Sequence, residues 1–147
     1  MQTYVVRSRG VIVHNDKLLV VHHPERDFFA LPGGHLDAGE NPKECIEREL
    51  IEELGVKPDI GRLLYIYTYA NKNNVFSVEF FFEITNGVDY LAHEGREKTH
   101  AHEIDEVRWI LPSDDIRLLP SEFLNEFKEG KVFYEDVRFL KGAHLDK

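Results

Sequence analysis

The chain has 147 residues, of which 42% are hydrophobic and 31% charged, a length and balance that favour one globular domain over residues 1–147 and argue against disorder. Its formal charge of −9 disfavours broad electrostatic binding to nucleic acid or to an anionic membrane. The sequence has no run of 18 apolar residues, so no transmembrane helix is expected. The only cysteine, Cys45, excludes an internal disulfide and favours a reducing cytoplasm.

The N-terminal third predicts strands and turns. Tyr4–His14 and Lys17–His22 are expected to pair as a hairpin, because Asn15-Asp16 between them is typical of a turn. Phe28–Leu31 predicts a further short strand, and Leu31–Gly34 (LPGG) predicts a turn. Such a turn is ordinarily structural, although its glycines also allow a ligand to approach the backbone closely.

The next segment carries the signals of a helix. Asn41 is a candidate N-cap, Pro42 occupies the first helical position, and Glu44 the third, which together resemble a capping box. We expect the helix to run to about Leu54 and to stop at Gly55. One apolar stripe should face the core: Ile46, Leu50 and Leu54.

The second half is richer in strands. Three are expected, over Ile60–Ala70, Val75–Ile84 and Glu103–Leu111. Residues 85–101 predict a long loop, and residues 113–130 predict two short helical stretches separated by Pro120, the second capped by Ser121. One long helix among several strands predicts an α+β domain with helices packed against a mixed sheet.

Two groups of side chains leave their roles open. Tyr65, Tyr67 and Tyr69 alternate on one strand face, either as half-buried sheet residues or as a surface that stacks on a base or sugar. The three histidines between residues 93 and 102 lack the tight ligand spacing of a transition-metal site and are interpreted as solvated.

The predicted helix also concentrates carboxylates. Glu49, Glu52 and Glu53 fall within an arc of about 100°, and Arg48 lies one turn before Glu52. Like charges at this spacing destabilise a helix, so this face is either solvated or binds a cation. Oxygen ligands suit Mg²⁺ or Mn²⁺ rather than Zn²⁺, and such an ion also accepts phosphate oxygens. The pattern therefore favours metal-assisted hydrolysis of a phosphate or diphosphate.

The spacing of this segment resembles the Nudix signature. Gly34, five residues, Glu40, seven residues and then Arg48–Val56 (RELIEELGV) agree with that signature at each defined position over 23 residues. The resemblance implies a Nudix fold, an α/β/α sandwich around a mixed sheet. It also implies Mg²⁺- or Mn²⁺-dependent hydrolysis of a nucleoside diphosphate linked to another moiety.

By position, the resemblance assigns roles to individual residues. Glu52 and Glu53 would be the principal metal ligands, and Glu49 a ligand or the base that activates water. Arg48 would orient these carboxylates, and Gly34 would offer its backbone carbonyl to the metal.

Two further glutamates complete the implied site. Glu40 would hold the loop to the helix. Glu103, ahead of the strand that contains Trp109, is either a further metal ligand or base, or an exposed residue at the start of the strand.

The signature does not choose the substrate. The short chain favours a nucleoside triphosphate of the MutT type or a dinucleoside polyphosphate, with Phe29, Tyr67 and Tyr69, and also Phe28, stacking on the base. Two alternatives stay open: a nucleotide-binding module without turnover, and an RNA 5′-end pyrophosphohydrolase, which the net acidity disfavours. A homodimer is also left open.

Overall fold

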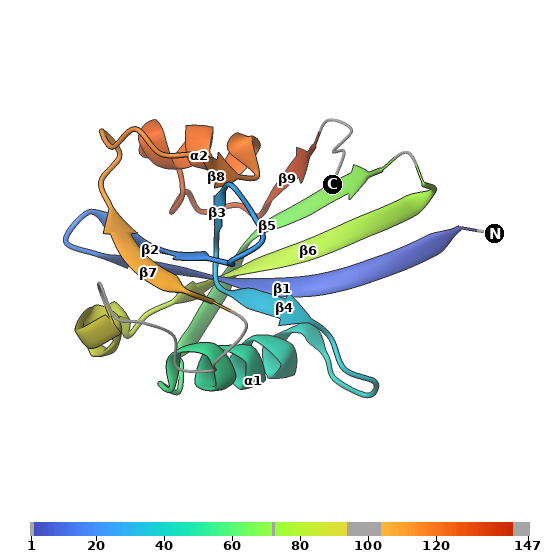
Figure 1. Ribbon diagram of the computed structural model, residues 1–147, viewed down its shortest axis with the longest axis horizontal. Helices are drawn as coiled ribbons and strands as arrows, with labels where there is room; N and C mark the ends of the chain where they lie inside the picture. Colours follow the sequence, from blue (N-terminus) through green and yellow to red (C-terminus); the bar gives the residue numbers. More distant parts are fainter. Residues whose placement is uncertain (1, 72, 94–103, 143–147) are drawn as a thin grey trace.

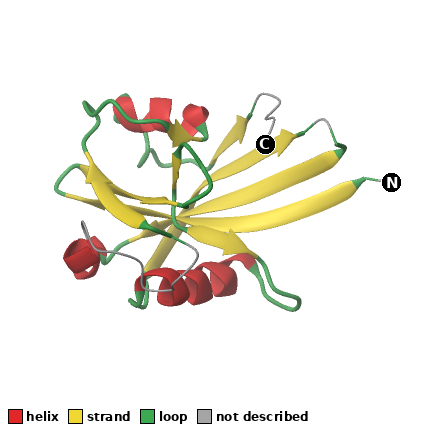
Figure 2. Ribbon diagram, in the orientation of Figure 1, coloured by secondary structure: helices red, strands yellow, loops and turns green. Residues whose placement is uncertain are grey.

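The computed structural model describes residues 2–71, 73–93 and 104–142 (Figure 1). Its strands are β1 (Thr3–His14), β2 (Lys17–His22), β3 (Phe29–Ala30), β4 (Gly33–His35), β5 (Ile60–Ala70), β6 (Val75–Ile84), β7 (Glu106–Ile110), β8 (Leu118–Leu119) and β9 (Arg138–Lys141). Its helices are α1 (Pro42–Leu54), the 3-10 helix η1 (Gly87–His93) and α2 (Ser121–Lys128). Figure 2 shows strands in the middle of the molecule and helices on both sides. This layering confirms the predicted α+β fold around a mixed sheet.

The strand β1 organises the sheet. It pairs in parallel with β6 over most of its length, and antiparallel with β4 at Arg9 and with β2 at Val13. The order of the sheet is β8-β3-β2-β1-β6-β5-β9, while β4 pairs with β1, and β7 with β2, outside this path. Side chains of β2 and of β5 and β6, including Val20, Tyr65 and Phe81, meet in one core. The sheet therefore folds onto itself around β1.

Successive residues of β1 belong to different cores, as the alternation of a strand requires. Val11 contributes to the core that contains Phe123 of α2. Ile12 contributes to the core that contains Leu50 of α1. The predicted apolar stripe is confirmed, since three helical residues have an exposed fraction of 0%: Ile46, Leu50 and Leu54. The carboxylate-bearing helix is thus fixed to one face of β1.

The ends of α1 are formed by local hydrogen bonds, as predicted. The Glu44 backbone N–H donates to the Asn41 side chain, and the Asn41 N–H donates to the Glu44 carboxylate, each at 2.9 Å. Gly55 ends the helix with a φ of 72°, and its N–H donates to the Ile51 carbonyl. Within the described ranges, no helix is long and apolar enough to cross a membrane.

Two segments predicted as irregular contain regular structure. Leu31–Gly34 was expected to form only a turn, but Gly33 and Gly34 begin β4 and pair with β1. A Cβ on Gly33 would lie 2.0 Å from the Ser8 carbonyl oxygen, so only glycine allows this close approach of the strands. Within the predicted loop 85–101, residues 87–93 form η1, and residues 94–101 lie outside the described part of the chain.

The prediction for the C-terminal third is wrong in two places. Instead of a helix before Pro120, Leu118 and Leu119 form β8, which pairs in parallel with β3. Ser121 is the first residue of α2 rather than its cap, and Pro120 precedes the helix without a side-chain hydrogen bond. The tail, which the sequence left ambiguous, adds β9 beside β5. These pairings join distant segments, and no local periodicity encodes them.

Candidate active site

The helix α1 and the strand β4 bring the predicted carboxylates against a glycine backbone. Glu53 is buried, with 2% of its surface exposed, and its carboxylate accepts a hydrogen bond from the Gly33 N–H at 3.0 Å. A buried carboxylate is stable only when charge or hydrogen bonds compensate it, and this bond is part of that compensation. The Gly33 backbone, in the segment predicted as a turn, therefore fixes one carboxylate oxygen of Glu53.

Gly34 leaves room for a second carboxylate. A Cβ at this position would lie 2.6 Å from the Glu49 carboxylate, so any larger residue would displace that side chain. The Gly34 carbonyl, a predicted metal ligand, lies 3.4 Å from the Cys45 sulfur, which also lies 3.4 Å from the His35 carbonyl. Burial raises the pKa of the Cys45 thiol, and this group therefore stays protonated at neutral pH. The lone cysteine is thus a weak donor beneath the loop.

Arg48 connects the remaining acidic residues. Its guanidinium donates to Glu49 at 3.0 Å, to Glu52 at 3.1 Å and to Glu40 at 2.6 Å, and it also donates to the His35 carbonyl at 3.0 Å. The hydrogen bonds to Glu40 are the main cause that raises the Arg48 pKa, which keeps this side chain charged. The Arg48 guanidinium therefore offsets the repulsion between carboxylates that share a helix face.

Glu40 anchors the loop to the helix. Its carboxylate accepts a hydrogen bond from the Asp37 N–H at 2.8 Å, in addition to its contacts with Arg48. The Arg48 hydrogen bond, followed by the Asp37 N–H, holds the Glu40 pKa below its ordinary value. These contacts match the bracing role that the resemblance implies.

The acidic residues offer the oxygen ligands that a hard cation prefers. Glu49, Glu52 and Glu53 supply carboxylate oxygens on one part of α1, and Gly34 supplies a nearby backbone carbonyl. Within the described residues, no three side chains of the metal-ligating types already converge on one point. Instead, Arg48 bonds to both Glu49 and Glu52. The residue types fit Mg²⁺ or Mn²⁺, and an entering ion would compete with Arg48 for these two carboxylates.

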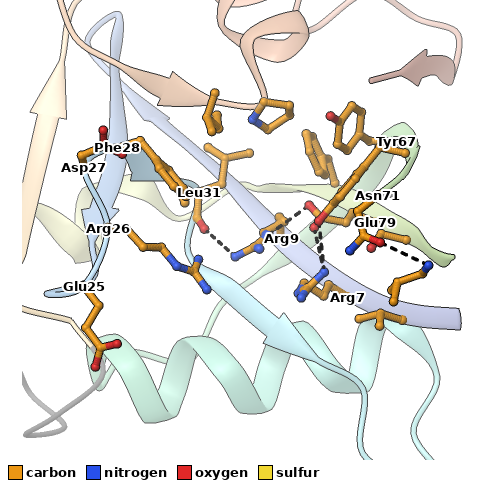
Figure 3. Close-up of a pocket in the computed structure, with 18 residues that line it drawn as sticks. Arg7, Arg9, Glu25, Arg26, Asp27, Phe28, Leu31, Tyr67, Asn71 and Glu79 are labelled. Atoms are coloured by element: carbon orange, nitrogen blue, oxygen red, sulfur yellow. Dashed lines mark hydrogen bonds and ion pairs between the residues drawn. The ribbon is translucent and has the colours of Figure 1, made fainter. Parts of the chain in front are cut away.

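A cavity of about 660 Å³ lies on the face of β1 that is opposite to α1 (Figure 3). Arg7 and Arg9 project into it and share the Glu79 carboxylate, at 3.5 and 3.2 Å respectively. Arg7 also donates to the Tyr69 hydroxyl at 3.4 Å. The loop between β2 and β3 contributes Arg26. A basic, partly aromatic cavity therefore adjoins the strand that carries the glycines.

The predicted aromatic residues are not all brought together. Tyr67 and Tyr69 both line the cavity, Tyr67 from a buried position with 1% of its surface exposed. Burial, the first cause, and the Glu122 carboxylate, the second, raise the Tyr67 pKa, so its hydroxyl stays protonated. Phe29 does not line the cavity; it packs against the His22 ring, and the Arg108 guanidinium lies 4.7 Å from its centroid. Phe28 lines the cavity in its place.

Sequence reasoning missed the charged residues of this cavity. Arg7 and Arg9 are two positions apart, so strand alternation places them on one face, which was a usable signal. Their contact with Glu79 depends on the parallel pairing of β1 with β6, which the sequence pattern does not reveal. Glu103, the predicted additional ligand or base, lies outside the described residues.

Comparisons with known proteins agree with this geometry. The NUDIX domain model matches residues 5–128. An "ADP-ribose pyrophosphatase" of Methanocaldococcus jannaschii is 32% identical over 84 residues, which cover 53% of this chain and 50% of that protein. An "8-oxo-(d)GTP phosphatase" of Mycolicibacterium smegmatis is 31% identical over 121 residues, 73% of this chain and 35% of that protein. The chain thus spans half or less of the length of these two relatives.

Solved structures share the fold. A MutT Nudix hydrolase from Burkholderia pseudomallei superposes with a TM-score of 0.67 at 20% identity, covering 86% of this chain and 98% of that one. An ADP-ribose pyrophosphatase from Streptococcus suis gives a TM-score of 0.65 at 21% identity, covering 92% and 98%. At these identities the likeness concerns the fold, and the domain match covers most of the chain. The chain belongs to the Nudix family.

Proposed function

We propose that this protein is a Mg²⁺- or Mn²⁺-dependent hydrolase that cleaves the diphosphate linkage of a nucleoside diphosphate joined to another moiety. The observation that carries the proposal is the placement of three carboxylates beside one glycine loop: Arg48 holds Glu49 and Glu52, and the Gly33 N–H holds Glu53. The family membership of the chain supports it, as do relatives named "ADP-ribose pyrophosphatase" and "8-oxo-dGTP diphosphatase". A structural helix has no need for three neighbouring carboxylates and a glycine that leaves room for one of them.

In this proposal Glu52 and Glu53 hold the metal, and Glu49 is either a ligand or the base. Gly34 adds its carbonyl, and Arg48 orients the carboxylates until the ion arrives. A bound Mg²⁺ would neutralise phosphate charge and lower the pKa of a water molecule. Glu103 stays a candidate for the base or for a further ligand.

The substrate is proposed to be a nucleoside triphosphate or a dinucleoside polyphosphate, in line with relatives named "8-oxo-(d)GTP phosphatase" and "8-oxo-dGTP diphosphatase". Relatives named as ADP-ribose pyrophosphatases make ADP-ribose an equal subject for testing. The cavity beside β4 is proposed to hold the nucleoside against Phe28 and Tyr69. We expect Phe29 to contribute less, because it packs outside the lining of the cavity.

A substrate panel tests the activity directly. Nucleoside triphosphates, dinucleoside polyphosphates, ADP-ribose, sugar nucleotides and capped RNA are incubated with Mg²⁺ or Mn²⁺, and the products are separated by chromatography. We expect metal-dependent cleavage within a diphosphate for at least one small nucleotide. If no compound is cleaved with either metal, the nucleotide-binding module replaces the enzyme as the better proposal. If only capped RNA is cleaved, an RNA 5′-end pyrophosphohydrolase becomes the better proposal.

Two further properties stay proposals. A cytoplasmic location rests on the single cysteine, which is buried and free. A homodimer rests on the apolar surface near β9, where Phe139 is 77% exposed at a strand edge. The mass of the protein in solution, measured by light scattering, decides the second.

A further inference from the structure

The cavity and the carboxylates lie on opposite faces of β1. The Ser8 hydroxyl donates to the Pro42 carbonyl at the start of α1, at 2.8 Å, and a Cβ on Gly10 would lie 3.2 Å from the Leu50 side chain. Ser8 and Gly10 therefore face α1. Arg7 and Arg9 face the other way, into the cavity. The arginines thus lie on the face of β1 opposite α1, although β4 adjoins both regions and Glu53 interacts electrostatically with Arg9.

Three arginines of the cavity lining lie close to a single shared carboxylate. Arg7 and Arg9 share one carboxylate, that of Glu79, which is 4% exposed. Arg26 forms no ion pair with any residue in the described part of the chain; its guanidinium lies 5.7 Å from the centroid of the Phe28 ring. Figure 3 shows its side chain extending toward Arg9 and Arg7. Three guanidiniums therefore lie near the Glu79 carboxylate, and Glu53 also acts electrostatically on Arg9.

The acidic residues at the rim do not cancel this excess. Asp27 pairs with Arg117 at 2.7 Å, outside the group of three arginines. The Glu25 carboxylate points away from those arginines in Figure 3. The excess of positive charge is notable in a protein whose formal net charge is −9.

The pKa of Arg26 is consistent with this excess: partial burial, followed by Arg9 and Arg7, lowers it. Arginine stays protonated at neutral pH, so the repulsion persists until an anion relieves it.

We propose that this cavity binds a phosphate monoester on the nucleoside of the substrate, remote from the diphosphate that is cleaved. The inference rests on the proposed function for its diphosphate. A phosphate group carries negative charge that complements these arginines, and it accepts several hydrogen bonds from guanidinium groups. Phe28 and Tyr69 line the same cavity and offer aromatic surface to the adjoining nucleoside. This inference therefore favours a ribose-phosphorylated nucleoside diphosphate derivative over the nucleoside triphosphates and dinucleoside polyphosphates proposed above.

Matched pairs of ligands test this without catalysis. NADPH and NADH differ by a 2′-phosphate, and coenzyme A and dephospho-coenzyme A differ by a 3′-phosphate. Calorimetric titrations in EDTA compare each pair on the wild-type protein, on Arg26→Met and on Lys17→Met. Arg26 and Lys17 both have solvent-exposed side chains, so neither change should disrupt the core, and both lower the net charge equally.

We expect the phosphorylated member of at least one pair to bind about tenfold more tightly to the wild type, as one charged hydrogen-bonding contact provides. The preferred pair identifies the position of the phosphate. Arg26→Met should remove the preference, and Lys17→Met should keep it. Equal affinity within both pairs, no binding of any of the four ligands, or a preference that survives in Arg26→Met, overturns the proposal.

The same four compounds with Mg²⁺ separate this inference from the proposed function. Cleavage of a diphosphate without preference for the phosphorylated member leaves the enzyme intact and contradicts the phosphate site. A binding preference in EDTA without turnover of any nucleotide supports the phosphate site and contradicts the enzyme.

Discussion

The two faces of β1 differ in the sign of their charged groups. On the α1 face, Glu49 and Glu52 are held together by the single guanidinium of Arg48. On the cavity face, Arg7 and Arg9 are held together by the single carboxylate of Glu79. Each face keeps an excess of one sign, and that excess indicates the ligand: a cation on the first face, an anion on the second. A metal-bound, phosphorylated nucleotide satisfies both.

The largest expected effect is the loss of a ligand charge on the α1 face. Glu53→Gln should lower turnover about a thousandfold, since several kcal/mol of charge stabilisation is lost. The fold should persist, because the amide oxygen still accepts the Gly33 N–H. Steady-state kinetics and thermal melts measure both, with the exposed Glu135→Gln as control. Near-normal turnover in Glu53→Gln would contradict the metal assignment.

The strand β4 adjoins both regions. Substitutions of its two adjacent glycines should distinguish an effect on stability from an effect on turnover. Gly33→Ala should lower the free energy of unfolding by about 2–4 kcal/mol, because its φ is +145° and its Cβ meets the Ser8 backbone. Gly34→Ala meets the movable Glu49 carboxylate, so it should cost less than about 1 kcal/mol and lower turnover about tenfold. Denaturant unfolding and kinetics compare the two. Equal stability of both variants would refute the distinction.

Two neighbouring phenylalanines should differ in their contribution to nucleoside binding on the cavity face. Phe28→Leu should raise KM about tenfold, because stacking on a base contributes about 1–3 kcal/mol, whereas Phe29→Leu should leave KM within about twofold of the wild type. The two residues are neighbours, but only Phe28 lines the cavity. KM for the best substrate of the panel measures the difference. A larger effect at Phe29 would show that the nucleoside lies elsewhere.

The smallest effect concerns the brace between loop and helix. The Glu40 pKa is lowered in the folded protein, so its carboxylate stabilises the fold above its unfolded pKa. That contribution is lost as the pH falls through the folded value. Wild type should therefore exceed Glu40→Gln in stability at pH 7, and the difference should vanish in strong acid. Denaturation at several pH values tests this, and a difference that is constant with pH would argue against the Arg48 pair.

Local signals made the α1 face predictable. Asn41, Glu44 and Gly55 fix the ends of the helix through neighbours in the sequence, and the carboxylates follow from helical periodicity. The antiparallel pairing of β1 with β2 also follows from a local signal, the Asn15-Asp16 turn. Even the bracing of Glu40 by Arg48 joins residues only eight positions apart.

The cavity face depends on contacts that the sequence does not encode locally. Arg7 and Glu79 are 72 positions apart and meet through the parallel pairing of β1 with β6. Phe28 lines the cavity and Phe29 does not, a choice set by the two-residue strand β3 and its pairing with β8. Such short strands carry too little periodicity to reveal which face is inward. The placement of the α1 carboxylates was therefore predictable, but the lining of the cavity was not.

The central claim is that the α1 carboxylates bind a divalent cation. Titration of Mn²⁺ followed by electron paramagnetic resonance tests it without a substrate. The account predicts saturable Mn²⁺ binding by the wild type, weakened at least about tenfold in Glu53→Gln and displaced by Mg²⁺. Identical Mn²⁺ binding by wild type and Glu53→Gln, or no binding by either, would contradict it.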